Sequence, residues 1–139
     1  MYIKRTTKRE WLAALELVQI GYPRVAGSTT KASELVFRGP CKYFIYSSTT
    51  KDSVDNNVDL LSGGFAIRRG ELVGLYSLEK GLGARMVNHA ITEGAVRLNC
   101  AGTVLRDYYK KFGFAVHKVE AGARKGHIDL FHMYLGESW

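Results

Sequence analysis

The chain has 139 residues, of which 46% are hydrophobic and 24% charged, and its formal net charge is +7. A chain of this length buries about two-thirds of its unfolded surface in one core, so it needs neither metals nor disulfides to fold. Its two cysteines, Cys41 and Cys100, are too few for a disulfide framework, and we expect free thiols. The composition predicts one domain over residues 1–139.

The N-terminal sequence lacks the apolar run and small-residue cleavage site of a secretory signal. The longest apolar stretch near it, residues 11–18, contains Glu16 and falls far short of the roughly 20 residues that span a bilayer. We therefore expect a cytoplasmic protein without a membrane partner. The charge of +7 favours anionic partners such as nucleic acid, phosphorylated cofactors or acidic proteins, and does not choose among them.

The chain opens with a predicted strand and an amphipathic helix. Residues 2–5 fit a short strand, and Thr7 and Glu10 have the spacing of a capping box, in which the hydroxyl accepts from a first-turn amide. The apolar residues that follow repeat at helical spacing to about Ile20. The pattern predicts a helix over this stretch.

The helix is expected to stop at Gly21 and Pro23. Residues 22–40 are polar and irregular, with one short helix around 31–37. Residues 42–46 are aromatic and β-branched and predict a strand.

A hairpin is predicted after a polar turn region at 47–57. Residues 63–68 and 71–77 read as strands, and Arg69 and Gly70 lie between them, where glycine supplies the positive φ of a tight turn. The strands up to this point are therefore expected to be antiparallel and sequential.

A glycine-rich loop opens the next helix. Gly81 and Gly83 stand between a strand and an apolar pattern with a period of 3.6 residues, and Gly94 follows as a C-terminal stop. Unpaired amides at such a helix start can hold a phosphate, although the same pattern also serves as a plain tight turn. The strand at 95–100 then completes a parallel β-α-β unit.

The C-terminal third predicts a short helix and two strands. Residues 104–112 form the helix, which Gly113 ends. Residues 114–119 and 127–135 read as strands on either side of a Gly/Lys/Arg loop at 120–126. The histidines of this region have no companions at metal-ligand spacing, so we expect no metal site.

Two motifs in this order resemble the GNAT superfamily of acyl-CoA-dependent N-acetyltransferases. The first is the loop Lys80-Gly81-Leu82-Gly83-Ala84, and the second is Tyr109-Lys110-Lys111-Phe112-Gly113-Phe114, which is similar to the family's Phe-Tyr-x-x-x-Gly-Phe segment. The resemblance covers roughly residues 63–119. Small GNAT-like proteins of bacteriophages are more similar still, through the shortened loop, Gly94-Ala95 and Leu98-Asn99-Cys100.

The resemblance implies an α/β domain with a central mixed and largely antiparallel sheet, helices on both faces, and a splay between the strands at 71–77 and 95–100. It implies direct transfer of an acetyl group from acetyl-CoA to an amine. Tyr109 would protonate the departing thiolate, and Glu71 is our candidate to accept the amine's proton. The implied cofactor-binding residues are Leu75, Tyr76, Ser77, Lys80, Gly81, Leu82, Gly83, Ala84 and Arg85.

Other interpretations of the same residues stay open. Tyr109 lies on an apolar stripe and fits a core tyrosine, and Glu71 fits a solvated hairpin residue. Leu78 occupies a position where the family usually has Gln or Arg, and the loop is short. The alternative function is therefore a catalytically inactive GNAT-like phage protein that binds a host protein or nucleic acid. For the latter, the C-terminal third offers Arg106, Lys110, Lys111, Lys118, Arg124 and Lys125.

Overall fold

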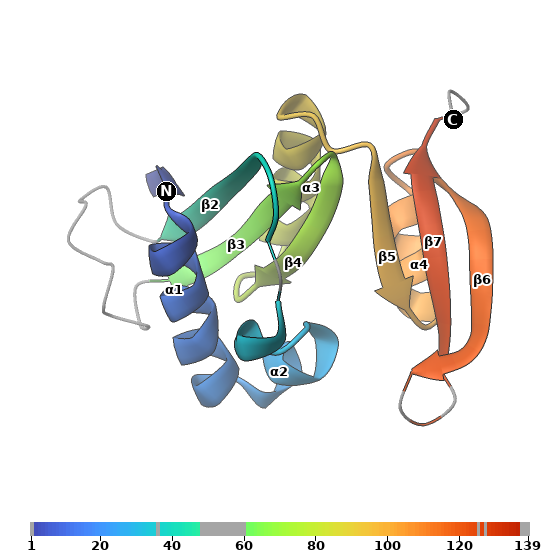
Figure 1. The fold of residues 1–139 in the computed structure, drawn as a ribbon, viewed down its shortest axis with the longest axis horizontal. Coiled ribbons are helices and arrows are strands. Elements are labelled where there is room, and N and C mark those ends of the chain that lie inside the picture. The colour runs from blue at the N-terminus through green and yellow to red at the C-terminus, as the bar shows by residue number, and fades with distance from the viewer. Residues whose placement is uncertain (1, 36, 48–60, 125, 127, 137–139) are drawn as a thin grey trace.

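The computed structural model describes residues 2–35, 37–47, 61–124, 126 and 128–136, and shows helices packed on both faces of one sheet (Figure 1). The sheet has seven strands in the order β1-β2-β3-β4-β5-β7-β6. The elements are β1 (Tyr2–Thr6), α1 (Lys8–Gly21), α2 (Pro23–Ser28), the 3-10 turn η1 (Ala32–Glu34), β2 (Cys41–Ser47), β3 (Leu61–Arg68), β4 (Glu71–Ser77), α3 (Leu82–Thr92), β5 (Arg97–Ala101), α4 (Thr103–Lys110), β6 (Phe114–Arg124) and β7 (Ile128–Leu135). Among the described residues, none of the helices combines the length and hydrophobicity that a bilayer crossing requires.

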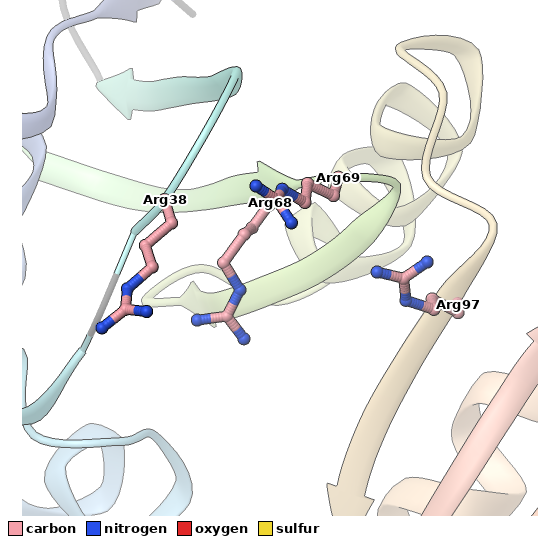
Figure 2. Close-up of a pocket in the computed structure, with 4 residues that line it drawn as sticks. All are labelled: Arg38, Arg68, Arg69 and Arg97. Atoms are coloured by element: carbon pink, nitrogen blue, oxygen red, sulfur yellow. The ribbon is translucent and has the colours of Figure 1, made fainter.

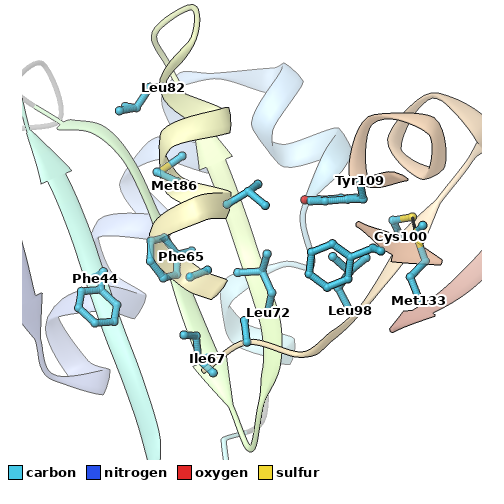
Figure 3. Packing of buried hydrophobic residues seen from close by; sticks show 14 of the residues in the cluster. Phe44, Phe65, Ile67, Leu72, Leu82, Met86, Leu98, Cys100, Tyr109 and Met133 are labelled. Carbon is cyan, nitrogen blue, oxygen red and sulfur yellow. Dashed lines mark hydrogen bonds between the residues drawn. The ribbon is translucent and has the colours of Figure 1, made fainter. Parts of the chain in front are cut away.

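Each face of the sheet has its own apolar cluster. On one face, α1 buries Trp11, Leu15 and Val18 completely against β2 and β3. On the other face, α3 and α4 pack over the middle of the sheet, and Figure 3 shows Met86 of α3 and Tyr109 of α4 in this second cluster. The two-sided packing confirms the α/β class predicted from the resemblance.

The first helix begins as the capping box predicts. The Thr7 hydroxyl accepts from the Glu10 amide at 3.3 Å, and the helix continues to Gly21. The prediction that 22–40 is irregular is partly wrong, because Pro23 opens α2. Proline is tolerated in the first turn of a helix, where its missing N–H needs no partner, and Val25, 3% exposed, buries this short helix in the α1 cluster.

The short helix expected around 31–37 is reduced to the single turn η1. The strand at 42–46 and the hairpin at 63–77 are confirmed, with Arg69 at φ +50° and Gly70 at φ +80° in the turn. Of the polar region predicted at 47–57, Ser47 ends β2, and 48–57 lie outside the described residues.

The sheet opens between its two parallel strands. β4 and β5 pair only at Glu71 with Arg97 and at Leu72 with Leu98, after which β5 runs away from β4 (Figure 1). β4 also carries a bulge opposite β3: Gly64 pairs with Tyr76 but Ala66 pairs with Val73, so β4 has one extra residue between. The expected splay is therefore present, and the bulge lies beside it.

The C-terminal hairpin is longer than predicted. Residues 120–124 belong to β6 instead of a loop, because Glu120 pairs with Leu130 and Arg124 with Ile128 across an irregular register. The Asp129 carboxylate accepts from the Gly122 amide at 2.9 Å and stabilises this irregularity. Lys125 and His127 lie outside the described residues.

Candidate functional site

Three elements meet at the open end of the splay: the end of β4, the start of α3, and α4. A Cβ atom added to Gly83 would lie 2.9 Å from the Tyr108 hydroxyl and 3.9 Å from Cβ of Ser77. Ser77 and Tyr108, which are 31 positions apart in the chain, thus both lie next to Gly83, and Gly83 has no room for a side chain. Sequence analysis identified Ser77 and Gly83 for this site but missed Tyr108, whose only signal was its place next to Tyr109.

The start of α3 suits an anion. Gly81 stands at its N-cap with φ +83° and no side chain caps the helix, so the first-turn amides of Gly83 and Ala84 lack intrahelical partners. The Leu82 amide is satisfied by the Glu79 carbonyl at 3.3 Å. The partial positive charge of a helix N-terminus then adds to these donors.

The side chains of the loop divide into two groups. Lys80 and Arg85 are exposed, and the Arg85 guanidinium lies 6.0 Å from the centre of the Tyr46 ring. Leu82 is 6% exposed and belongs to the core, so only its backbone is open to a ligand. The basic charge at this helix start is therefore carried by two side chains.

Successive main-chain N–H and C=O groups of β4 point alternately toward β3 and toward the splay. The Leu78 amide donates to the Ser62 carbonyl at 2.8 Å, so the main-chain groups of Ser77 and Leu75 point the other way, toward the missing partner strand. The Ser77 carbonyl accepts from Nη2 of Arg24 in α2 at 3.1 Å. An extended ligand entering the splay would meet the remaining unpaired groups as an added strand does.

Two predicted side chains of this region face away from the splay. Tyr76 is 3% exposed in the α1 cluster, and its buried hydroxyl has no hydrogen-bond partner among the described residues. Burial raises the pKa of Tyr76. Leu78 packs against the same α1 cluster. The position where the resemblance implies Gln or Arg is therefore held by a partly buried apolar side chain.

Tyr109 lies on the inner face of α4. It is 8% exposed, and Figure 3 shows its hydroxyl pointing from α4 toward β4 and α3. Burial raises the pKa of Tyr109, with smaller contributions from Cys100 and Tyr108 in the same direction. The phenol is therefore held in its protonated form at neutral pH and is a weaker acid than an exposed tyrosine.

Glu71 lies at the closed end of the β4–β5 pair. Its carboxylate is 3.3 Å from Nη2 of Arg68, and its register partner on β5 is Arg97. Leu75 is the fourth residue after Glu71 on β4, a span of about 13 Å. The structure thus brings Glu71 together with arginines and not with the glycine loop.

Other charged residues are distributed differently from the sequence expectation. Within the C-terminal third, Arg106 pairs with Asp107 at 2.9 Å and Lys118 with Glu120 at 3.7 Å, so part of the basic run is neutralised. In the described part of the chain, no three metal-ligating side chains come together.

A single sheet that splays between two parallel strands, beside a helix that begins at a glycine loop, defines the fold of the GNAT N-acyltransferases. No protein-family model matches the chain, and no curated protein matches its sequence. Solved structures do match it over nearly the whole chain.

Three of these structures illustrate the likeness. An acyl-CoA N-acyltransferase of Pseudomonas aeruginosa has a TM-score of 0.62 at 13% identity, covering 98% of this chain and 100% of its own. ElaA of Escherichia coli has a TM-score of 0.67 at 14% identity, covering 97% and 99%. An aminoglycoside 6'-N-acetyltransferase of Enterococcus faecium has a TM-score of 0.60 at 13% identity, covering 97% and 96%. The chain therefore has the GNAT fold.

Proposed function

We propose that this protein is an acyl-CoA-dependent N-acetyltransferase that transfers an acetyl group from acetyl-CoA directly to an amine. The observation that carries the proposal is the splay between β4 and β5, with the uncapped start of α3 at its open end and Tyr109 of α4 facing it. Bound acetyl-CoA supplies the acetyl group as a thioester. The rest of the chemistry belongs to residues of the chain.

The glycine loop and β4 would hold the co-substrate. Amides of Gly83 and Ala84, together with Lys80 and Arg85, provide donors and positive charge for a pyrophosphate. The unpaired main-chain groups around Leu75 would pair with the amides of the pantetheine arm and polarise the thioester carbonyl. Gly83 itself has no room for a side chain, because the Tyr108 hydroxyl lies 2.9 Å from its Cβ position.

Tyr109 would act as the general acid. The amine nitrogen forms a bond to the carbonyl carbon, the carbon–sulfur bond breaks, and the departing thiolate takes a proton from the Tyr109 hydroxyl. The attacking amine loses one proton, and Glu71 remains our candidate acceptor for it, through water across the intervening strand residues. The products are an amide and the free thiol of CoA, and the proton taken from the amine then replaces, through water, the one that Tyr109 gave up.

Measurements of binding and of turnover test the two parts of the proposal, the co-substrate site and the general acid, separately. Isothermal titration calorimetry with acetyl-CoA tests the loop, and the absence of heat at millimolar ligand would refute the transferase function. Tyr109→Phe should lower kcat about 100-fold while the Kd for acetyl-CoA changes less than about twofold, since a proton donor acts in the transition state. Tyr2→Phe on the edge strand β1 is the matched control.

The role of Glu71 needs a different readout. If it accepts the proton, Glu71→Gln removes the acidic limb of the kcat/KM profile. If the carboxylate only holds Arg68, the variant leaves the shape of the profile unchanged and shifts stability alone. An unchanged profile would remove Glu71 from the mechanism and leave Tyr109 in place.

A second candidate is a GNAT-like protein, of the phage type, that has lost catalysis and binds a host protein or nucleic acid. Leu78 favours it, because this residue packs against the α1 cluster where the family usually places a polar side chain. Under this alternative acetyl-CoA does not bind. Nucleic-acid binding would then show as an affinity that falls steeply with salt.

A further inference from the structure

Four arginines surround a cavity of about 270 Å3 at the closed end of the β4–β5 pair. They come from three separate parts of the chain: the segment before β2, the β3–β4 hairpin, and the start of β5. Figure 2 shows Arg97 extending from β5 toward the hairpin that carries Arg68 and Arg69, with Arg38 on the other side of the group. The glycine loop and Tyr109 do not line this cavity, whereas Glu71 contacts one of its arginines.

The cavity has an excess of positive charge. Arg68 pairs with Glu71 at 3.3 Å and lies 6.0 Å from the centre of the Phe37 ring. Within the described residues, the other three guanidinium groups make no ion pair. The like charges of guanidinium groups around one cavity repel one another, and each planar guanidinium can bind two oxygens of a carboxylate or phosphate. An anion with several oxygens is the ligand that such a group fits.

The backbone of Arg69 supports a role beyond folding. It is the one non-glycine residue with positive φ in the described part of the chain, at +50° in the first position of the two-residue turn. Asparagine or glycine is favoured there, because other side chains are strained in this conformation. A Cβ on Gly39 would lie 2.9 Å from Nε of Arg69. The Arg69 guanidinium therefore extends from a strained turn and lies against Gly39.

The arginines lie on the face of the sheet from which an acceptor would approach. Ile67, Leu72 and Leu98 point into the α3 and α4 cluster, so their neighbours Arg68, Glu71 and Arg97 point to the opposite face. The start of α3, where the co-substrate would bind, lies on the side of that cluster. An amine must then reach the thioester from the face that carries α1.

A second cavity of about 170 Å3 continues along this face. It shares Arg97 with the first cavity and extends over β5 and β7, where Asn99 and His132 are register partners. The two strands part at Leu72. Leu75 is the third residue after Leu72 and the fourth after Glu71 on β4, which gives spans of about 10–13 Å. The two cavities therefore meet at Arg97, and a path from them to the splay runs along these residues of β4.

We propose that this path binds the acceptor, and that the acceptor is an amine bearing carboxylate or phosphate groups about 10–13 Å from its nitrogen. The inference rests on the transferase function proposed above and specifies its substrate class. It separates this protein from its fold neighbour that acetylates aminoglycosides, which are polycations. The acidic end would bind the arginines, and the amine would lie beside Leu75.

Peptides with an N-terminal α-amine test this spacing. Positions 4 and 5 of an extended peptide lie about 10–13 Å from its amine. Three peptides therefore differ only at these two positions, which are both Asp in the first, both phosphoserine in the second and both Asn in the third. Fluorescence anisotropy of C-terminally labelled peptides should give at least tenfold tighter binding for an acidic peptide than for the Asn peptide. The stronger of the two acidic peptides assigns carboxylate or phosphate. Equal affinity for all three would overturn the proposal.

Variants of the cavity arginines test whether these residues cause the higher affinity for acidic peptides. Arg97→Gln and Arg69→Asn should each weaken acidic-peptide binding about tenfold and leave the Asn peptide unchanged. Arg69→Asn should also raise the melting temperature by about 3–5 °C, because asparagine suits the turn. Arg9→Gln, an exposed α1 residue that lines neither cavity, is the control with the same change of charge. A loss of affinity in Arg9→Gln as large as in Arg97→Gln would show that net charge alone attracts the peptide and would refute the site.

Acetyl transfer distinguishes failure of this inference from failure of the proposed function. Release of the CoA thiol should be at least tenfold faster with an acidic peptide than with the Asn peptide or spermidine. Equal or faster transfer to spermidine overturns the acceptor class and leaves the transferase standing. Tight acidic-peptide binding without any acetyl-CoA binding overturns the assignment as an acceptor site together with the transferase function.

Discussion

The bulge in β4 depends on Gly74, and its substitution gives the sharpest test of the structure. Gly74 has φ +64°, and a Cβ placed on it would lie 2.7 Å from Cη2 of Trp11. Trp11 is fully buried, so its ring has no space to retreat. Gly74→Ala would therefore combine backbone strain with overpacking.

The two contributions can be separated with matched glycines. Gly81 has φ +83° but nothing within 4 Å of its added Cβ, so Gly81→Ala measures the strain alone, about 1–2 kcal/mol. Gly27, in α2, has ordinary φ and open space, so Gly27→Ala should stabilise the protein by about 0.5–1 kcal/mol. Overpacking adds about 1–3 kcal/mol, so Gly74→Ala should cost about 2–5 kcal/mol.

Equilibrium unfolding in urea measures all three variants, provided that the slope with denaturant stays constant. The order of stability should be Gly27→Ala, wild type, Gly81→Ala and Gly74→Ala. A Gly74→Ala protein as stable as Gly81→Ala would refute the contact with Trp11. Because Gly74 lies in the bulge next to Leu75, we also expect Gly74→Ala to weaken acetyl-CoA binding.

Three further predictions concern the surroundings of the site. Gly83→Ala should destabilise the wild type by about 1 kcal/mol, because its Cβ would lie 2.9 Å from the Tyr108 hydroxyl. In a Tyr108→Phe background that hydroxyl is absent, so Gly83→Ala should be neutral to stabilising there; additive effects in urea unfolding would contradict the contact. Tyr46→Phe should cost about 1–2 kcal/mol, because the buried hydroxyl hydrogen-bonds Nδ1 of His89, and unchanged thermal unfolding would count against that bond. Burial raises the pKa of Cys100 to about 11. Its contribution to the free energy of unfolding is therefore complete below pH 9, where the thiol is protonated in both states, and is lost from about pH 9 to 11 as the unfolded chain ionises. The difference in melting temperature between wild type and Cys100→Ala should shrink over that range, and a constant difference would disprove the burial effect.

Local sequence signals predicted most elements because each depends on residues close together in the chain. The Thr7 cap, the turn at Arg69 and Gly70, and the helix after Gly81 are all present. The errors occurred where a distant contact decided the outcome. Val25 holds α2 against α1 in a stretch that looked irregular, and pairing with β7 extends β6 over residues that looked like a loop.

For the candidate site, the sequence determined the glycine loop and Tyr109, and through their resemblance to GNAT enzymes it indicated the fold. Only the tertiary structure placed Tyr108 against Gly83, set Glu71 among arginines, and gathered Arg38, Arg69 and Arg97 around one cavity. A helix cap or turn is fixed by bonds between near neighbours, whereas these groupings follow from strand order and register. Those depend on the packing of the whole sheet, which no short stretch of sequence contains.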